Sequence, residues 1–231
     1  MANLSPLSVA FLLFPGVTQL DLTGPAQVLS RLGNTTIHLV SKTMDPVPTD
    51  AGFSLLPTDT FSDVTSATIV CIPGGFGTLD AMRDDATRQW VRSVGETAEW
   101  VTSVCTGSLV LGAAGLLKGY RAACHWASID QLTYFGAEPV RERTVRDRNR
   151  VTGGGVTSGI DFALSLAAMI RGEAHAKFIQ LSIEYDPAPP FDCGAPEKAD
   201  DDTLAQYRDM IEAAVPDRDG TVQKIARDLG F

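Results

Sequence analysis

Residues that bind metals or form disulfide bonds are scarce in this sequence. Its 231 residues include only four cysteines and three histidines. The cysteines (Cys71, Cys105, Cys124 and Cys193) form no close pair and no metal-ligand spacing. We therefore expect no metal cofactor, and we predict free thiols in the reducing cytoplasm.

Basic charge is also in short supply. Lysine and arginine together number 19 against 28 aspartates and glutamates, which gives a formal net charge of −9 at pH 7. This balance argues against nucleic acid or an anionic membrane as a partner, because both attract proteins through positive charge. The basic run 141–150 is interrupted by acidic residues and alternates like a hairpin, so we expect a solvated edge there.

Long hydrophobic runs are missing as well. The apolar segment Ser8–Phe14 has no basic region before it and ends at Pro15-Gly16. A membrane-spanning helix needs roughly 20 apolar residues, so this segment is too short, and it also lacks the cleavage-site pattern of a signal peptide. We predict that it is a buried strand of a soluble protein.

The remaining sequence alternates strand and helix patterns, which favours an α/β fold with a mostly parallel sheet and helices on both faces. We predict one domain over residues 1–231, with a core at about 7–185, a proline-rich arm at 186–201 and C-terminal helices at 202–231. Strands are expected at 8–14, 37–41, 67–72, 100–104 and 121–124, and helices at 21–32, 84–98, 160–170 and 173–185. Ligands of such sheets bind beyond the carboxyl ends of the strands.

Cys105 lies where the strand pattern 100–104 gives way to the small, helix-compatible residues that follow it. A cysteine at this switch stands on a sharp turn, as in a nucleophile elbow, and the amino end of the next helix favours its thiolate. The structural alternative is a buried, inert thiol. We interpret Cys105 as a nucleophile, with Thr106 able to donate a hydrogen bond to the sulfur.

Pro73-Gly-Gly-Phe-Gly77 follows another strand pattern but carries neither glycine-rich nucleotide motif, so we expect no nucleotide. Two interpretations of Gly75 stay open, and both can hold at once. Its N–H group can face Cys105 as an oxyanion donor, or the glycine can serve a tight turn that requires positive φ.

Asp21 and His125 are the candidate acid–base groups near Cys105. Asp21 lies between two leucines at the start of a predicted helix, where it either favours the helix dipole or shares a proton with the thiol. His125 follows a strand that we expect in the same sheet. A structural or orienting role for His125 is weighed against a role as base.

Several of these segments resemble the PfpI-like branch of the class I glutamine amidotransferase superfamily, which has a flavodoxin-like fold. They include Ile72-Pro-Gly-Gly75, Ser103-Val-Cys-Thr-Gly107, Cys124-His-Trp126 and Thr152-Gly-Gly-Gly155. The cysteine segment and Glu184–Phe191 are most similar to the branch members that hydrate isocyanides. The resemblance implies that Cys105 is the nucleophile and Asp21 the acid, and that the protein is a homodimer without cofactor.

The expected reaction is the hydration of an isocyanide to an N-substituted formamide through a covalent thioimidate on Cys105. Many relatives have glutamate at the position of Asp21, and some have histidine at the position of Thr106. These departures count against protease, amidotransferase and α-oxoaldehyde activities. An oxoaldehyde enzyme and a thiol redox sensor remain alternatives. So does the sensor domain of an AraC-type regulator, although the chain ends where a DNA-recognition helix would follow.

Overall fold

A seven-stranded sheet forms the centre of the computed structural model, which describes residues 4–231; residues 1–3 of the predicted domain lie outside that range. The strand order is β10-β11-β7-β6-β1-β2-β5, with the bounds β1 Leu7–Leu12, β2 Thr35–Ser41, β5 Asp59–Thr60, β6 Ile69–Ile72, β7 Trp100–Val104, β10 Thr144–Asp147 and β11 Arg150–Gly153. All neighbours are parallel except β10 and β11, which form an antiparallel hairpin. The predicted α/β fold is confirmed.

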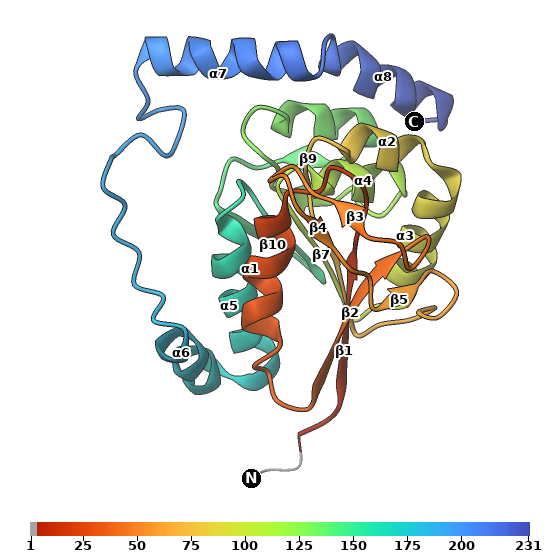
Figure 1. Ribbon diagram of the computed structural model, residues 1–231, viewed down its shortest axis with the longest axis vertical. Helices are drawn as coiled ribbons and strands as arrows, with labels where there is room; N and C mark the ends of the chain where they lie inside the picture. The colour runs from red at the N-terminus through yellow and green to blue at the C-terminus, as the bar shows by residue number, and fades with distance from the viewer. Residues whose placement is uncertain (1–3) are drawn as a thin grey trace.

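Helices cover both faces of this sheet (Figure 1). On one face α1 (Gln19–Leu29) packs against α5 (Ser158–Arg171), and on the other lie α2 (Thr78–Arg83), α3 (Asp85–Thr97) and α4 (Gly107–Ala113). The central strands read as continuous apolar runs because both of their faces are buried, and every residue of β6 is buried.

The segment 121–124 departs from the prediction. β8 (Arg121–Ala122) pairs with β9 (Glu138–Pro139) in a separate two-stranded sheet, so the expectation that it joins the central sheet was wrong. Side chains hold the backbone of Ala123 instead. Its N–H donates to Thr152 Oγ1 at 2.8 Å, and its carbonyl accepts from Ser108 Oγ at 2.6 Å. Beyond this segment the chain forms a 3-10 helix, η1 (Ile129–Phe135).

Other short elements complete the body of the molecule. Residues 42–66 contain a short antiparallel hairpin of β3 (Val47–Pro48) and β4 (Ser54–Leu55). Helix α2 was not predicted. It has six residues and follows directly after the glycine-rich turn, where the sequence shows no clear helical periodicity.

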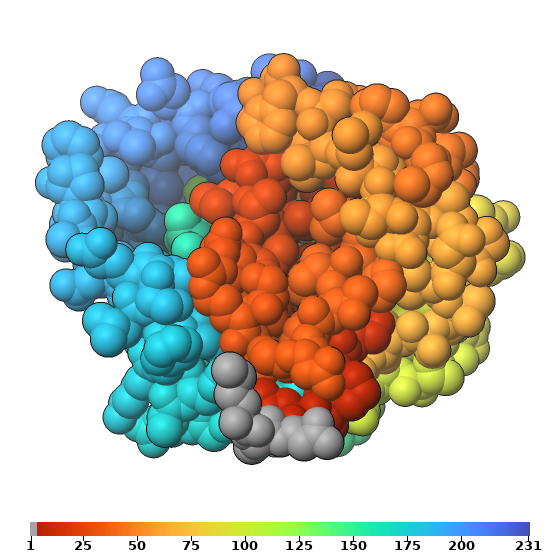
Figure 2. All heavy atoms as spheres, turned by 60° about the horizontal axis from the view of Figure 1, so that its bottom comes forward, coloured from red at the N-terminus to blue at the C-terminus, as the bar shows by residue number. Residues whose placement is uncertain are grey.

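The C-terminal quarter of the chain returns to the carboxyl edge of the sheet. Helix α6 (Glu173–Ser182) and the proline-rich arm that follows it form one side of the molecule (Figure 2). Helices α7 (Asp201–Ala214) and α8 (Arg218–Asp228) then lie across the carboxyl edge of the sheet (Figure 1). Helix α8 is anchored by Val222 and Ile225, whereas α7 has no buried residue. Within residues 4–231, no helix has the length and apolar character needed to cross a membrane.

The carboxyl ends of four adjacent strands, β1, β6, β7 and β11, meet at this edge. Each is followed by a feature that the sequence analysis singled out: α1 with Asp21, the turn with Gly75, Cys105, and the glycines 153–155. The sheet order brings these segments together although they span more than a hundred residues of sequence.

Gly107 makes the contact between β6 and the start of α4 possible. A Cβ atom at this position would lie 2.0 Å from Ile72 O and 2.7 Å from Pro73 O, both backbone atoms. Because backbone cannot move aside easily, we expect Gly107→Ala to lower the free energy of unfolding by about 1–3 kcal/mol in urea titrations. Gly155→Ala is the matched control, since a Cβ atom there would have nothing within 4 Å; equal losses for both variants would contradict this assignment.

Candidate active site

Cys105 adopts the strained backbone expected of a nucleophile elbow. It stands between β7 and α4 with φ at 57°, in the left-handed region that non-glycine residues rarely occupy. Its N–H donates to Gly153 O at 3.1 Å, which ties the turn to the end of β11. The side chain is 6% exposed and reaches a cavity, so Cys105 is buried and accessible to a small molecule.

Asp21 lies in the first turn of α1 but is completely buried. Its Oδ2 accepts a hydrogen bond from Gly74 N–H at 2.9 Å, while Oδ1 has no well-formed hydrogen bond within residues 4–231. Burial raises the pKa of Asp21 from 3.8 to about 7, although hydrogen bonds from Gly74 and from the Cys105 thiol act in the opposite direction. A solvent-exposed role at the helix end does not fit this environment.

Neighbouring groups act on the pKa of the Cys105 thiol in opposite directions. Burial and then the negative charge of Asp21 raise the pKa of Cys105 well above 9.0, whereas hydrogen bonds from the amide and hydroxyl of Thr106 lower it. The expectation that the helix end favours the thiolate is therefore opposed by burial. Because two negative charges in this buried site are unfavourable, the carboxyl and the thiol hold one proton between them above about pH 7 and two below it.

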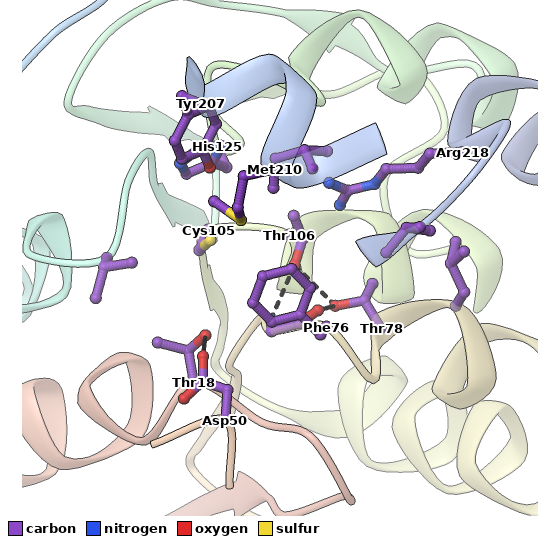
Figure 3. A pocket seen from close by; sticks show the side chains of 15 residues that line it. Thr18, Asp50, Phe76, Thr78, Cys105, Thr106, His125, Tyr207, Met210 and Arg218 are labelled. Carbon is purple, nitrogen blue, oxygen red and sulfur yellow. Dashed lines mark hydrogen bonds between the residues drawn. The ribbon is translucent and has the colours of Figure 1, made fainter. Parts of the chain in front are cut away.

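The turn after β6 supports Thr106. Gly75 N–H donates to Thr106 Oγ1 at 3.0 Å, and Thr78 Oγ1 lies 2.7 Å from the same oxygen (Figure 3). Since the Thr78 hydroxyl donates to Gly75 O at 2.6 Å, the Thr106 hydroxyl is the donor in the contact between the two threonine oxygens. The Gly75 N–H thus orients Thr106 and does not face the sulfur as expected. The φ of Gly75 is 140°, which confirms the tight-turn interpretation of this residue.

His125 borders the same cavity as a neutral side chain. Burial and then the charge of Arg218 lower the pKa of His125 to about 4. Its Nδ1 accepts from Ala127 N–H at 3.3 Å, and its ring stacks on Tyr207 with centroids 6.1 Å apart. These contacts favour the structural role over a role as base.

The cavity above Cys105 has a volume of about 230 Å³ and mostly apolar walls. One wall comes from α7 and α8, which the sequence analysis did not include in the site: Tyr207, Met210, Ile211, Val215 and Arg218 (Figure 3). The spacing of Tyr207, Met210 and Ile211 marks one face of a helix, and this signal could have identified them. On the other side of the cavity, Thr18 donates a hydrogen bond to Asp50 Oδ2 at 2.5 Å.

The other cysteines do not extend the site. Cys71 and Cys124 are buried, and Cys193 is exposed in the arm. Over the part of the chain that the structure describes, no group of three or more histidine, cysteine or acidic side chains could hold a metal ion.

This combination of a cysteine elbow and a flavodoxin-like sheet agrees with comparisons of the whole chain. A model of the DJ-1/PfpI family matches residues 7–169. The chain belongs to the DJ-1/PfpI family. The predicted PfpI-like membership is thereby confirmed, and both Asp21 and Cys105 lie within the matched residues.

Among DJ-1/PfpI relatives, the chain is 48% identical over 225 residues to the isonitrile hydratase of Pseudomonas putida, which covers 97% of this chain and 99% of that protein. It is also similar to the crystal structure of a THiJ/PfpI family protein from Pseudomonas syringae, at 43% identity and a TM-score of 0.89, covering 99% of this chain and 92% of that one. A regulator of Pseudomonas aeruginosa, the HTH-type transcriptional regulator CdhR, is 30% identical over 76% of this chain and 53% of its own length.

The raised pKa of Asp21 has a consequence for stability. Between about pH 4 and pH 7 the folded protein binds a proton at Asp21 more tightly than the unfolded chain does, so stability falls as pH rises through this window. Asp21→Asn cannot ionise. We therefore expect its free energy of unfolding, relative to wild type, to rise by about 2–3 kcal/mol between pH 5 and pH 8.

Urea unfolding with a thiol reductant at both pH values measures this difference. Asp80→Asn is the control, because the side chain of Asp80 is 89% exposed and should give a pH-independent difference. A parallel pH dependence of wild type and Asp21→Asn would show that the Asp21 carboxyl is not the group that titrates.

Proposed function

We propose that this protein is an isocyanide hydratase, which converts R–N≡C and water into the formamide R–NH–CHO. The observation that carries the proposal is the fully buried Asp21 carboxyl beside Cys105, whose side chain lines a small, mostly apolar cavity. Supporting it is the 48% identity to an isonitrile hydratase over almost the full length of both chains.

The first step uses both members of the pair. Transfer of the thiol proton to the Asp21 carboxylate leaves a Cys105 thiolate, which hydrogen bonds from Thr106 stabilise. The sulfur attacks the terminal carbon of the isocyanide. Asp21 then protonates that carbon as it gains carbanion character, and the product is the thioimidate R–N=CH–S–Cys105.

The second step returns the site to its starting state. The Asp21 carboxylate takes a proton from water, whose oxygen adds to the thioimidate carbon, and Asp21 then gives this proton to the nitrogen. The tetrahedral intermediate collapses with expulsion of the Cys105 thiolate, and Asp21 receives the hydroxyl proton. One water molecule is consumed, and no electrons are exchanged with an outside reagent. The proposal therefore needs no cofactor.

The surroundings of the pair suit this chemistry better than that of a cysteine–histidine relay. The pKa of His125 is lowered to about 4, and its Nδ1 already accepts a hydrogen bond, so His125 is a weak base. The apolar walls formed by Met210 and Ile211 suit the hydrocarbon group of an isocyanide.

The proposal includes a cytoplasmic homodimer. All four cysteines are free thiols, which agrees with a reducing compartment. Large apolar side chains are exposed on α6 and in the arm, with Phe178 at 65%, Leu181 at 80% and Phe191 at 76% exposure. Such side chains favour burial against a second copy of the chain.

The decisive experiment is formamide production from 4-nitrophenyl isocyanide by purified protein, followed by chromatography, with methylglyoxal consumption measured alongside. We expect rapid formamide release by the wild type, none by Cys105→Ala, and unchanged release by Cys193→Ala, whose cysteine is exposed in the arm and does not line the cavity. Intact-mass analysis should detect the thioimidate adduct during turnover. Formamide production by Cys105→Ala, or consumption of methylglyoxal alone, would refute the proposal.

The acid–base role of Asp21 predicts a pH profile. Below about pH 7 both members of the pair are protonated, so kcat/KM should rise through pH 7 as one proton is lost. Asp21→Asn cannot carry that proton, and we expect a loss of about 10²–10⁴-fold in kcat/KM together with loss of the rise near pH 7. A variant that keeps wild-type rates would leave Asp21 a purely structural residue.

A further inference from the structure

Arg218 contributes a positive charge to the cavity that the proposed chemistry does not use. It is the first residue of α8, and its guanidinium group is directed toward the space over Cys105 and Thr106 (Figure 3). Its Nε is buried and, within residues 4–231, has no hydrogen-bond partner. Among the same residues, no acidic side chain lies within 4.0 Å of the guanidinium. An unpaired guanidinium donor in a buried position is unfavourable unless a ligand occupies it.

The acidic residues closest in sequence are engaged elsewhere. Asp217 caps α8 by accepting from Gly220 N–H at 3.3 Å, and Asp219 accepts from the Tyr134 hydroxyl at 2.8 Å. Glu212 accepts from the backbone N–H of Asp217 at 3.2 Å. These carboxylates line an adjoining cavity, which Arg218 also borders, and none of them lines the cavity above Cys105.

The charge of Arg218 shifts the pKa values of two residues that line the cavity above Cys105. After burial, it is the next cause that lowers the pKa of His125, and it also lowers the pKa of the Tyr207 hydroxyl against the effects of burial and Cys105. The acidic residue of the lining, Asp50, accepts a hydrogen bond from Thr18 on the opposite side (Figure 3). A ligand in this cavity therefore meets Cys105 at its base and the guanidinium of Arg218 at its α8 wall.

We propose that Arg218 binds an anionic group of the substrate, so that the preferred isocyanides carry a carboxylate on the hydrocarbon group, at the end remote from the isocyano carbon. This inference rests on the proposed hydratase function. The planar guanidinium matches a carboxylate through paired hydrogen bonds, and the buried Nε supplies one of the donors. Between the two ends, Tyr207, Met210 and Ile211 contact the hydrocarbon part.

The test compares 4-isocyanobenzoate with 4-isocyanobenzamide, which has the same shape without the charge. We expect the wild type to show a kcat/KM about tenfold to hundredfold higher for the benzoate, mainly through KM, because a hydrogen-bonded ion pair distinguishes the two. Arg218→Gln should lower this ratio to near one, and Arg218→Lys should restore part of it. Thermal unfolding of each variant verifies that it is folded.

Arg208→Gln is the matched control, since Arg208 lies on the adjoining cavity and does not line the cavity above Cys105. It should keep the wild-type ratio. A wild type without preference for the benzoate, or an Arg218→Gln variant that keeps the preference, overturns the role of Arg218 while leaving the hydratase function intact.

A second readout does not depend on turnover. Benzoate should slow the alkylation of Cys105 by iodoacetamide, measured by peptide mass spectrometry, in the wild type but not in Arg218→Gln. Protection without turnover of either isocyanide would support the anion site and overturn the hydratase function and the substrate class together. Equal alkylation rates with and without benzoate in the wild type would overturn the anion site.

Discussion

Burial of a carboxyl group against a thiol limits how much negative charge the site can hold. Asp21 is completely buried and Cys105 almost so. Burial raises the pKa of both groups, and the charge of Asp21 raises the pKa of Cys105 further. Above about pH 7 the pair therefore holds one proton, because burial and the first negative charge both oppose a second. The donors around it, Gly74 N–H and Thr106, reduce the energetic cost of the charge that remains.

The sheet provides the precision that this arrangement needs. Four adjacent parallel strands end at the same edge, and glycines at the turns allow backbones to come close there. Gly75 illustrates the indirect effect. Its N–H group fixes the Thr106 hydroxyl, and that hydroxyl in turn faces the sulfur. The strained φ of Cys105 persists because β7, α4 and the hydrogen bond to Gly153 hold both ends of the turn.

Patterns local in sequence predicted most of the fold and the centre of the site. The strands and the elbow at Cys105 follow from apolar runs and their switch to helix-compatible residues, whereas the role of Asp21 as the acid came from the family resemblance. Features that depend on contacts distant in sequence were not predicted. The segment 121–124 has a strand pattern, but side chains of Ser108 and Thr152 satisfy its backbone outside the main sheet. The contribution of α7 depends on where the arm leads the chain, and no local pattern specifies that path.

Family membership and cavity shape are carried by different parts of this chain. The residues that match the DJ-1/PfpI family end at 169, and both Asp21 and Cys105 fall inside them. The wall opposite Cys105 comes from α7 and α8, beyond that limit, and α7 buries none of its residues in the core. Substitutions on the face of α7 that lines the cavity therefore do not disturb the packing of the core, unlike substitutions in the sheet. Substrate range can diverge among relatives at this helix while the reacting pair stays the same.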